Sequence, residues 1–295
     1  VLGERLTAAH AGAIRDLHER NERLSQAYAE LQAAQAQLIE KERLERELQV
    51  AFEIQMSILP RQMPAVPGYR LAARIIPARM VGGDFFDAFP LDGGAVGVAI
   101  GDVTDKGVPA AIFMAQARAL LRAEATRAAS PREALERVNG HLLQMNDAGL
   151  FVTMVYGVLD PAAGTFRYAR AGHELPAIRR ASGEVAAAPL RSGMALGLVA
   201  SPPIDEQAIT IDPGEALLLY TDGVTEAYDA AHDEFGAARL HAELAVGGAR
   251  PAEAICDRIV AAVLAFQAPM PQHDDITLVV VQRDQPGDGG QGAAL

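Results

Sequence analysis

Apolar residues recur every seven positions in the first part of the chain. The two seams of this repeat consist, in chain order, of Ile14, Leu17, Asn21, Leu24, Tyr28, Leu31 and Leu38. Neither glycine nor proline interrupts the stretch between Gly12 and Pro60. The pattern predicts a coiled-coil helix over residues 1–45 that joins two copies of the chain as a homodimer. A single solvated helix, or one that lies on its own domain, is the alternative.

The seven-residue spacing breaks after Leu38. Leu48 follows ten residues later, a spacing that would overwind a coiled coil locally. A new face then continues to Ile58, and Pro60 should end the helix because it lacks an N–H and its ring clashes with the preceding turn. We therefore assign the end of this helix to the following domain, as a switch helix.

Beyond Pro60 the pattern changes to short apolar runs separated by Gly, Pro and Asp. Connections such as Asp160-Pro161 are short, which implies antiparallel pairing. The predicted strands cover residues 70–76, 84–89, 95–100, 151–159, 165–171, 177–180, 207–211, 216–221 and 276–282.

Helical patterns interrupt the strands in two places. The first pair covers residues 109–127 and a helix that opens at the capping box Ser130-Pro131-Arg132-Glu133, and the second pair covers residues 237–245 and 252–266. Strands in blocks with grouped helices predict an α+β fold: a two-sheet antiparallel β-sandwich flanked by helices, over residues 46–284. The glycine-rich residues 285–295 should form a disordered tail.

Composition and charge argue against several classes of function. The 295 residues carry a formal net charge of −12, which disfavours binding to nucleic acid or to an anionic membrane. Cys256 is the single cysteine, so no internal disulfide is possible and we expect a cytoplasmic protein. No apolar run approaches the ~20 residues that span a bilayer. Because the chain begins with Val1, we expect it to be a piece of a longer protein, with an upstream sensor domain outside it.

Acidic residues stand at the ends of apolar strands. Asp84, Asp102, Asp222 and Asp274 each adjoin such a run. An Asp-Gly or Gly-Asp step alone is more often a turn than a ligand. If these strand ends converge, the carboxylates would raise one another's pKa unless a cation lay among them. Hard oxygen ligands favour Mg²⁺ or Mn²⁺, and flanking glycines would let the carbonyl of Val103 coordinate too.

Six segments carry a resemblance to a known family. They are residues 51–60, 77–87, 101–110, 171–173, 220–223 and 274–277, the last four reading Gly-Asp-Val-Thr-Asp-Lys-Gly-Val-Pro-Ala, Ala-Gly-His, Tyr-Thr-Asp-Gly and Asp-Asp-Ile-Thr. In this order they resemble the PPM family of metal-dependent Ser/Thr phosphatases, in the SpoIIE/RsbU branch, over about residues 45–284. Two departures are Met80, where relatives commonly have an acid, and Arg170, where they often have asparagine.

The resemblance implies a fold, an activity and roles for named residues. The fold is a two-sheet β-sandwich covered by helices, and the activity is the hydrolysis of phosphoserine or phosphothreonine with two ions, Mn²⁺ or Mg²⁺. Asp102 would bridge both ions with the Val103 carbonyl on one of them, Asp222 and Asp274 would hold the other, and Asp84 would belong to the second ion's shell, directly or through water. The implied substrate is a phosphorylated anti-sigma-factor antagonist, a small STAS-domain protein of a partner-switching pathway.

Other polar residues near these motifs have open roles. Arg79 is a candidate to bind the phosphate, or else a solvated arginine. His173 is expected to hold its loop by hydrogen bonds, while Lys106 either orients the substrate or faces solvent. Asp275 should alternate to the opposite side of its strand from Asp274, away from the ions. The competing functions are a non-catalytic phosphatase-like signalling module and a phosphohydrolase that acts on nucleotides.

Overall fold

The computed structural model describes residues 2–246 and 250–285 and contains two compact units, residues 1–51 and 52–295. Helix α1 (Leu2–Ile58) forms the first unit and ends in the second, so that the helix stops two residues before Pro60 as predicted. The predicted disordered tail, apart from residue 285, lies outside the described residues.

The first unit is helical throughout its described length. Its seam residues are exposed: the exposed fraction is 70% for Leu17 and 68% for Leu24, and Tyr28, Leu31 and Leu38 are similar. A repeating row of exposed large apolar side chains on one helix is what a partner helix would cover. The coiled coil and the dimer stay predictions.

The second unit contains two five-stranded sheets in which all neighbours are antiparallel. The first sheet has the order β1 (Tyr69–Ile76), β10 (Ile276–Arg283), β9 (Ala216–Tyr220), β6 (Ala177–Arg179) and β7 (Val185–Ala187). The second has the order β2 (Phe85–Pro90), β3 (Val96–Val103), β4 (Val152–Asp160), β5 (Thr165–Ala171) and β8 (Asp205–Thr210).

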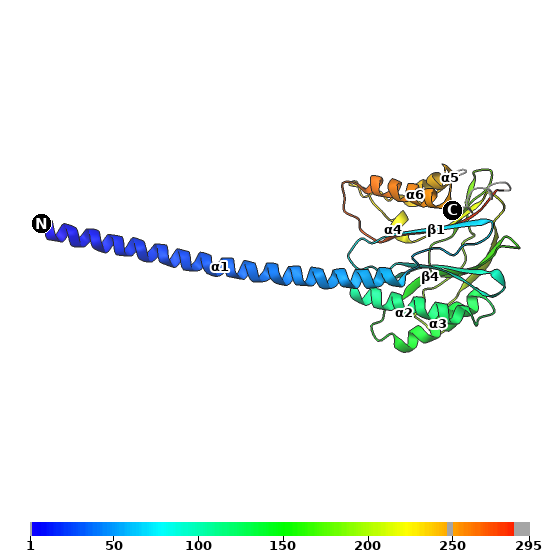
Figure 1. Ribbon diagram of the computed structural model, residues 1–295, viewed down its shortest axis with the longest axis horizontal. Coiled ribbons are helices and arrows are strands. Elements are labelled where there is room, and N and C mark those ends of the chain that lie inside the picture. Colours follow the sequence, from blue (N-terminus) through cyan, green and yellow to red (C-terminus); the bar gives the residue numbers. More distant parts are fainter. Residues whose placement is uncertain (1, 247–249, 286–295) are drawn as a thin grey trace, which may run out of the picture. The chain divides into compact units, whose positions relative to one another are not determined.

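Helices cover the outer face of each sheet (Figure 1). Helices α2 (Val108–Ala125) and α3 (Pro131–Met145) contact the second sheet, while α6 (Ala252–Gln267) contacts β1 and β10, and α5 (Gly236–Val246) contacts β6 and β7. A short 3₁₀ turn, η1 (Asp92–Gly94), and a short helix, α4 (Asp222–Thr225), complete the unit. The predicted helix–sheet–sheet–helix sandwich is confirmed.

Strand β9 shows how the layers are held together. All five of its residues are buried. Leu217 and Leu219 belong to the core between the sheets, whereas Leu218 and Tyr220 belong to a second core under α5 and α6. Because side chains alternate along a strand, a central strand that is covered on both faces must be apolar at every position.

A buried ion cluster fixes α2 against the second sheet. Asp87 on β2 is fully buried, and its carboxylate lies 3.0 Å from Nε of Arg118 and 2.7 Å from Nε of Arg122. Arg122 also donates through Nη2 to the other oxygen of Asp87, at 2.8 Å. Two guanidinium groups satisfy one buried carboxylate, so Asp87 supports the packing of α2, which begins beside the acidic residues described next.

Candidate metal centre

Strand register brings the acids of each sheet together. Phe85 of β2 pairs with Gly101 of β3, so that Asp84 and Asp102 are neighbours at the end of these strands. In the other sheet Tyr220 pairs with Leu278, and the N–H of Thr221 donates to the carbonyl of Thr277 at 3.1 Å. Asp222 and Asp274 therefore lie at one end of β9 and β10.

Two threonines join these strand ends across the sandwich. The hydroxyls of Thr221 and Thr277 donate to Oδ2 of Asp84 at 2.8 Å and 2.5 Å. All three residues are buried. The acids of the two sheets thus meet in one region. A site built from the acids at these strand ends requires this convergence.

The loop before β2 lies against the acids, because its two glycines allow a close backbone approach. A Cβ atom on Gly83 would stand 2.6 Å from the carbonyl oxygen of Val103, and one on Gly82 would stand 1.9 Å from Oδ2 of Asp275. Only glycine permits such close approach. Asp275 accepts from the N–H groups of Ala78 at 2.8 Å and Gly83 at 3.1 Å, so that its carboxylate holds the loop.

The last turn of α1 holds the same loop. Nε2 of Gln55 donates to the carbonyl of Gly82 at 2.6 Å, and the N–H of Gly82 donates to Oε1 of Gln55 at 3.2 Å. Gln55 is buried, and the pair satisfies both polar groups of Gly82. The position of Gly82 therefore depends on the orientation of this helical turn.

Burial and mutual repulsion perturb the acids. Burial, and then the charges of Asp102 and Asp275, raise the pKa of Asp84 well above its usual value. Burial raises the pKa of Asp102 to about 7, with the charge of Asp222 adding to the rise and a hydrogen bond to Asp84 opposing it. The pKa of Asp222 is raised by burial and by Asp274. Carboxyls that disfavour one another's ionisation form a site that a cation stabilises.

The donor set fits a hard divalent cation. Carboxylates and a main-chain carbonyl are the ligands that Mg²⁺ and Mn²⁺ prefer, and Gly83 leaves the Val103 carbonyl uncovered by a side chain. The carboxylates adjoin one another without forming a closed cage: within residues 2–246 and 250–285, no three acidic, histidine or cysteine side chains have metal-ligand spacing. The carboxylate of Asp84 accepts hydrogen bonds from Thr221 and Thr277, and the carboxylate of Asp274 contacts Lys106. These contacts account for the lack of a closed cage among the described residues.

The other candidates lie at the rim or beneath the acids. Arg79 is exposed on the loop before Gly82. Nδ1 of His173 lies 2.8 Å from Oγ1 of Thr153, which also donates to the carbonyl of Asp102 at 3.4 Å. Burial lowers the pKa of His173 to about 3, so the imidazole is neutral near pH 7 and supports the strand end. Lys106 contacts Asp274, with Nζ 2.9 Å from Oδ1.

Arg170 anchors the His173 loop. Its Nη1 donates to the carbonyl of His173 at 2.9 Å, and Nη2 donates to the carbonyl of Arg191. The side chain is buried, and its Nε lies 3.6 Å from the carboxylate of Asp205. The departure from asparagine at this position is thus compensated by a buried charge partner from β8.

Sequence reasoning missed several residues that organise the site. Gln55, Thr221 and Thr277 carry no ligand pattern of their own, and for Asp275 the sequence raised only the question of metal binding. The threonines flank the acids in Thr221-Asp222 and Asp275-Ile276-Thr277, which is the one sequence feature that could have drawn attention to them.

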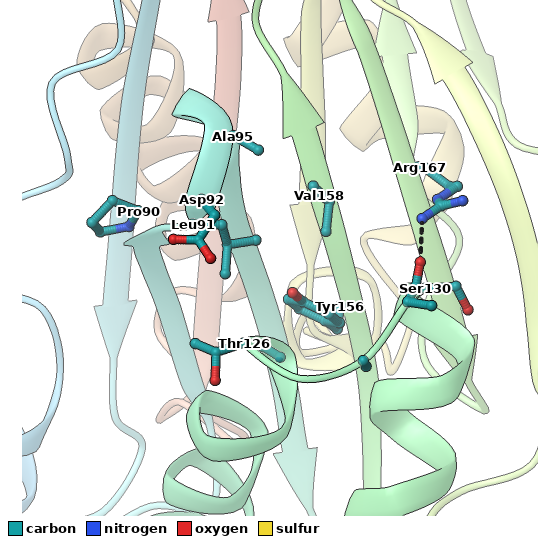
Figure 2. A pocket seen from close by; sticks show the side chains of 12 residues that line it. Pro90, Leu91, Asp92, Ala95, Thr126, Ser130, Tyr156, Val158 and Arg167 are labelled. Atoms are coloured by element: carbon teal, nitrogen blue, oxygen red, sulfur yellow. Dashed lines mark hydrogen bonds between the residues drawn. The ribbon is translucent and has the colours of Figure 1, made fainter.

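A separate pocket lies at the far ends of β2 and β3 (Figure 2). It has a volume of about 330 Å³ and is lined by Leu91, Tyr156, Arg167 and residues of the α2–α3 loop. Arg167 donates to the carbonyl of Ala129 at its edge, at 3.0 Å. Asp84 and Asp102 stand at the opposite ends of the same strands. The acidic cluster, not this hollow, is therefore the candidate site.

Comparison with known proteins identifies relatives. The family described as Stage II sporulation protein E (SpoIIE) matches residues 92–284. The chain is 32% identical to Protein IcfG of Synechocystis over 81% of this chain and 42% of that protein. It is 27% identical to Phosphoserine phosphatase RsbU of Bacillus subtilis over 63% of this chain and 55% of that protein. The chain spans about half the length of these curated relatives.

A solved structure is similar to the chain in fold as well as in sequence. The crystal structure of the RsbU and RsbW domains of a Mycobacterium tuberculosis protein matches with a TM-score of 0.66 and 30% identity, over 78% of this chain and 64% of that one. Among the described residues, no helix combines the length and the apolar character that crossing a bilayer requires. With the family match covering most of the chain and the fold shared, the chain belongs to the SpoIIE family, in the SpoIIE/RsbU branch of the PPM-type phosphatases.

Proposed function

We propose that the chain is a metal-dependent protein phosphatase that hydrolyses phosphoserine or phosphothreonine. The observation that carries this proposal is the meeting of buried and half-buried acids from the strand ends of both sheets. The pKa values of Asp84, Asp102 and Asp222 rise because of burial and because the acids repel one another. Hydrolysis of a phosphoester needs an activated water and neutralisation of the phosphoryl oxygens, and little further covalent chemistry from the protein.

Named residues would hold the ions. Asp102 with the Val103 carbonyl, and Asp222 with Asp274, would hold two ions of Mn²⁺ or Mg²⁺, with Asp84 in the second ion's shell. Bound ions of this kind lower the pKa of water and neutralise charge on the phosphoryl group.

The rest of the chain orients these ligands. Thr221 and Thr277 hold Asp84, while Asp275 and Gln55 hold the loop whose Gly83 lies against the Val103 carbonyl. Arg79, exposed on that loop, would grip the phosphate with its planar guanidinium.

We infer that the substrate is a phosphorylated STAS-domain antagonist of an anti-sigma factor, within a cytoplasmic partner-switching pathway. The RsbU relative is a phosphoserine phosphatase, which supports a phosphorylated serine as the group removed. The exposed seam of α1 supports a homodimer, through which an upstream sensor domain would control the site.

Turnover of an aryl phosphate and of a phosphorylated STAS-domain protein tests the activity. Each is measured with Mn²⁺, with chelator, and with Asp102→Asn. We expect chelator or Asp102→Asn to reduce turnover by at least about 100-fold, because both remove the charge that stabilises the transition state. Asp147→Asn, an exposed acid outside the site, is the matched control and should keep full turnover. Full activity in chelator would refute the proposal.

The alternative is a non-catalytic signalling module with the same fold. The presence of all the proposed carboxylates in one region favours the enzyme. Isothermal titration calorimetry separates the two, since a module without catalysis would show no heat of Mn²⁺ binding at millimolar metal.

A further inference from the structure

Lys106 stands on a loop whose backbone is held in an uncommon conformation. The loop joins β3 to α2, and Asp105 and Gly107 on either side of Lys106 have φ angles of 72° and 85°. A left-handed conformation is costly for a residue with a Cβ, so it persists only where the surroundings fix it. Here Oδ1 of Asp105 accepts from the N–H of Lys106 at 2.8 Å, which fixes the turn.

This turn directs the ammonium group of Lys106 to the segment before β10. Its Nζ lies 2.9 Å from Oδ1 of Asp274 and donates to the carbonyl of His273 at 2.8 Å. The same Oδ1 of Asp274 accepts from the N–H of Asp275 at 2.9 Å. The exposed fractions of the two charged side chains are 27% and 35%, so the pair is partly shielded from water. One oxygen of a proposed metal ligand is thus already engaged by a protein cation.

The charge environment makes this contact unusual. The whole chain contains two lysines, Lys41 on α1 and Lys106, within a net charge of −12. The charge of Lys106 also acts to lower the pKa of Asp222, which burial and the charge of Asp274 raise. Two cations that need the same carboxylate compete for it, because each gains Coulomb attraction from the same negative charge.

We propose that Lys106 is a built-in cation of the acidic site, a positioning residue that holds Asp274 and competes with the divalent ion for it. This inference rests on the proposed metal-dependent function and deepens it. Lys106 thereby weakens metal affinity and stabilises the carboxylates whenever the divalent ion is scarce. On Asp274, Nζ would give way to a divalent ion.

The sign of the effect on metal affinity separates this role from a structural one. If Lys106 only held the loop, its removal would disorder the ligands and weaken metal binding. If Lys106 competes, its removal strengthens binding, because the site loses a positive charge and Asp274 becomes available. Replacement by arginine keeps the charge and should keep the affinity of the wild type.

The test is calorimetric titration of Mn²⁺ into the full chain. We expect Lys106→Met to bind Mn²⁺ roughly tenfold more tightly than the wild type, since one unit of positive charge is removed from a carboxylate that would hold the ion. Lys106→Arg should stay within about threefold of the wild type on the same grounds. Lys41→Met is the control: it removes the second lysine of the chain, which lies on α1 outside the site, and should not change the affinity.

Thermal melting in chelator gives a second readout. Lys106→Met should lower Tm by roughly 1–3 °C, because the carboxylates lose their counter-charge, whereas Lys106→Arg should not. Unchanged or weaker Mn²⁺ binding in Lys106→Met overturns the inference while leaving the phosphatase proposal intact. Absence of Mn²⁺ binding in the wild type would instead remove the phosphatase proposal itself.

Discussion

At the scale of single residues, the site depends on atoms that approach more closely than side chains normally allow. Gly82 and Gly83 bring the backbone against Asp275 and the Val103 carbonyl, and two threonine hydroxyls fix Asp84. The glycines could be predicted from the sequence, because two glycines directly before an acid at a strand end indicate a close backbone approach. The hydrogen-bond partners could not, because Thr221 and Thr277 are separated from Asp84 by 137 and 193 positions.

Gly83→Ala should weaken Mn²⁺ binding by at least about tenfold and lower the free energy of unfolding by about 1–3 kcal/mol, because the added Cβ overlaps the Val103 carbonyl. Calorimetry and chemical denaturation measure the two effects. Gly140→Ala is the matched control: a Cβ atom there would meet nothing within 4 Å beyond the backbone of its own helix α3, so helix propensity should leave stability unchanged or slightly higher. Equal Mn²⁺ affinity in both variants would show that the close approach of Gly83 to the Val103 carbonyl does not matter for metal binding.

His173 should make stability depend on pH in a defined direction. Burial holds its folded-state pKa at about 3, below the usual 6.5, so below pH 6.5 the unfolded chain binds a proton that the folded chain does not. The free energy of unfolding should therefore fall as the pH drops from about 6.5, by about 1 kcal/mol per unit. Carboxyls with raised pKa act in the opposite direction, so the measurement is the difference between the wild type and His173→Gln. Parallel curves for the two proteins would contradict the assignment.

At the scale of elements, the alternation and turn chemistry predicted nearly all of the sandwich. Every predicted strand exists with ends within a few residues, because buried strands and short turns are local properties. β7 (Val185–Ala187) was missed, since three residues carry too little pattern, and α4 (Asp222–Thr225) was missed because Asp-Gly suggested a turn. The tertiary contact of Gln55 could not be predicted from a helical face alone.

Gln55→Leu should detach the loop from the last turn of α1. Both polar groups of Gly82 would lose their partner in a buried position, a cost of about 1–3 kcal/mol. We expect weaker Mn²⁺ binding together with lower phosphatase turnover. Gln62→Leu, at an exposed glutamine shortly after the end of α1, serves as the control. Unchanged metal affinity in Gln55→Leu would argue against coupling between this helical turn and the site.

At the scale of the whole molecule, the chain combines a helical unit with a two-sheet unit whose acids are drawn from both sheets. The heptad pattern predicted the long helix, which the structure contains. The exposed apolar seam favours a dimer over a lone helix, because a partner helix would cover it. Solution measurements decide between them.

The double substitution Leu24→Glu with Leu31→Glu should convert a dimer into a monomer in sedimentation equilibrium, because it places charge on the seam. The control is Gln26→Glu with Ala33→Glu, two exposed positions off the seam, which should remain dimeric. A wild-type chain that sediments as a monomer at about 50 μM would contradict the predicted coiled coil, since stable zippers associate well below that concentration.

Anomalous scattering from a crystal soaked in Mn²⁺ would locate the ions that the acidic site is proposed to hold. We expect two peaks among the strand ends, both beside the Asp102 carboxylate and one of them about 2.0–2.3 Å from oxygens of Asp222 and Asp274. A soaked crystal with no peak at these carboxylates, or with manganese bound only elsewhere, would contradict this expectation.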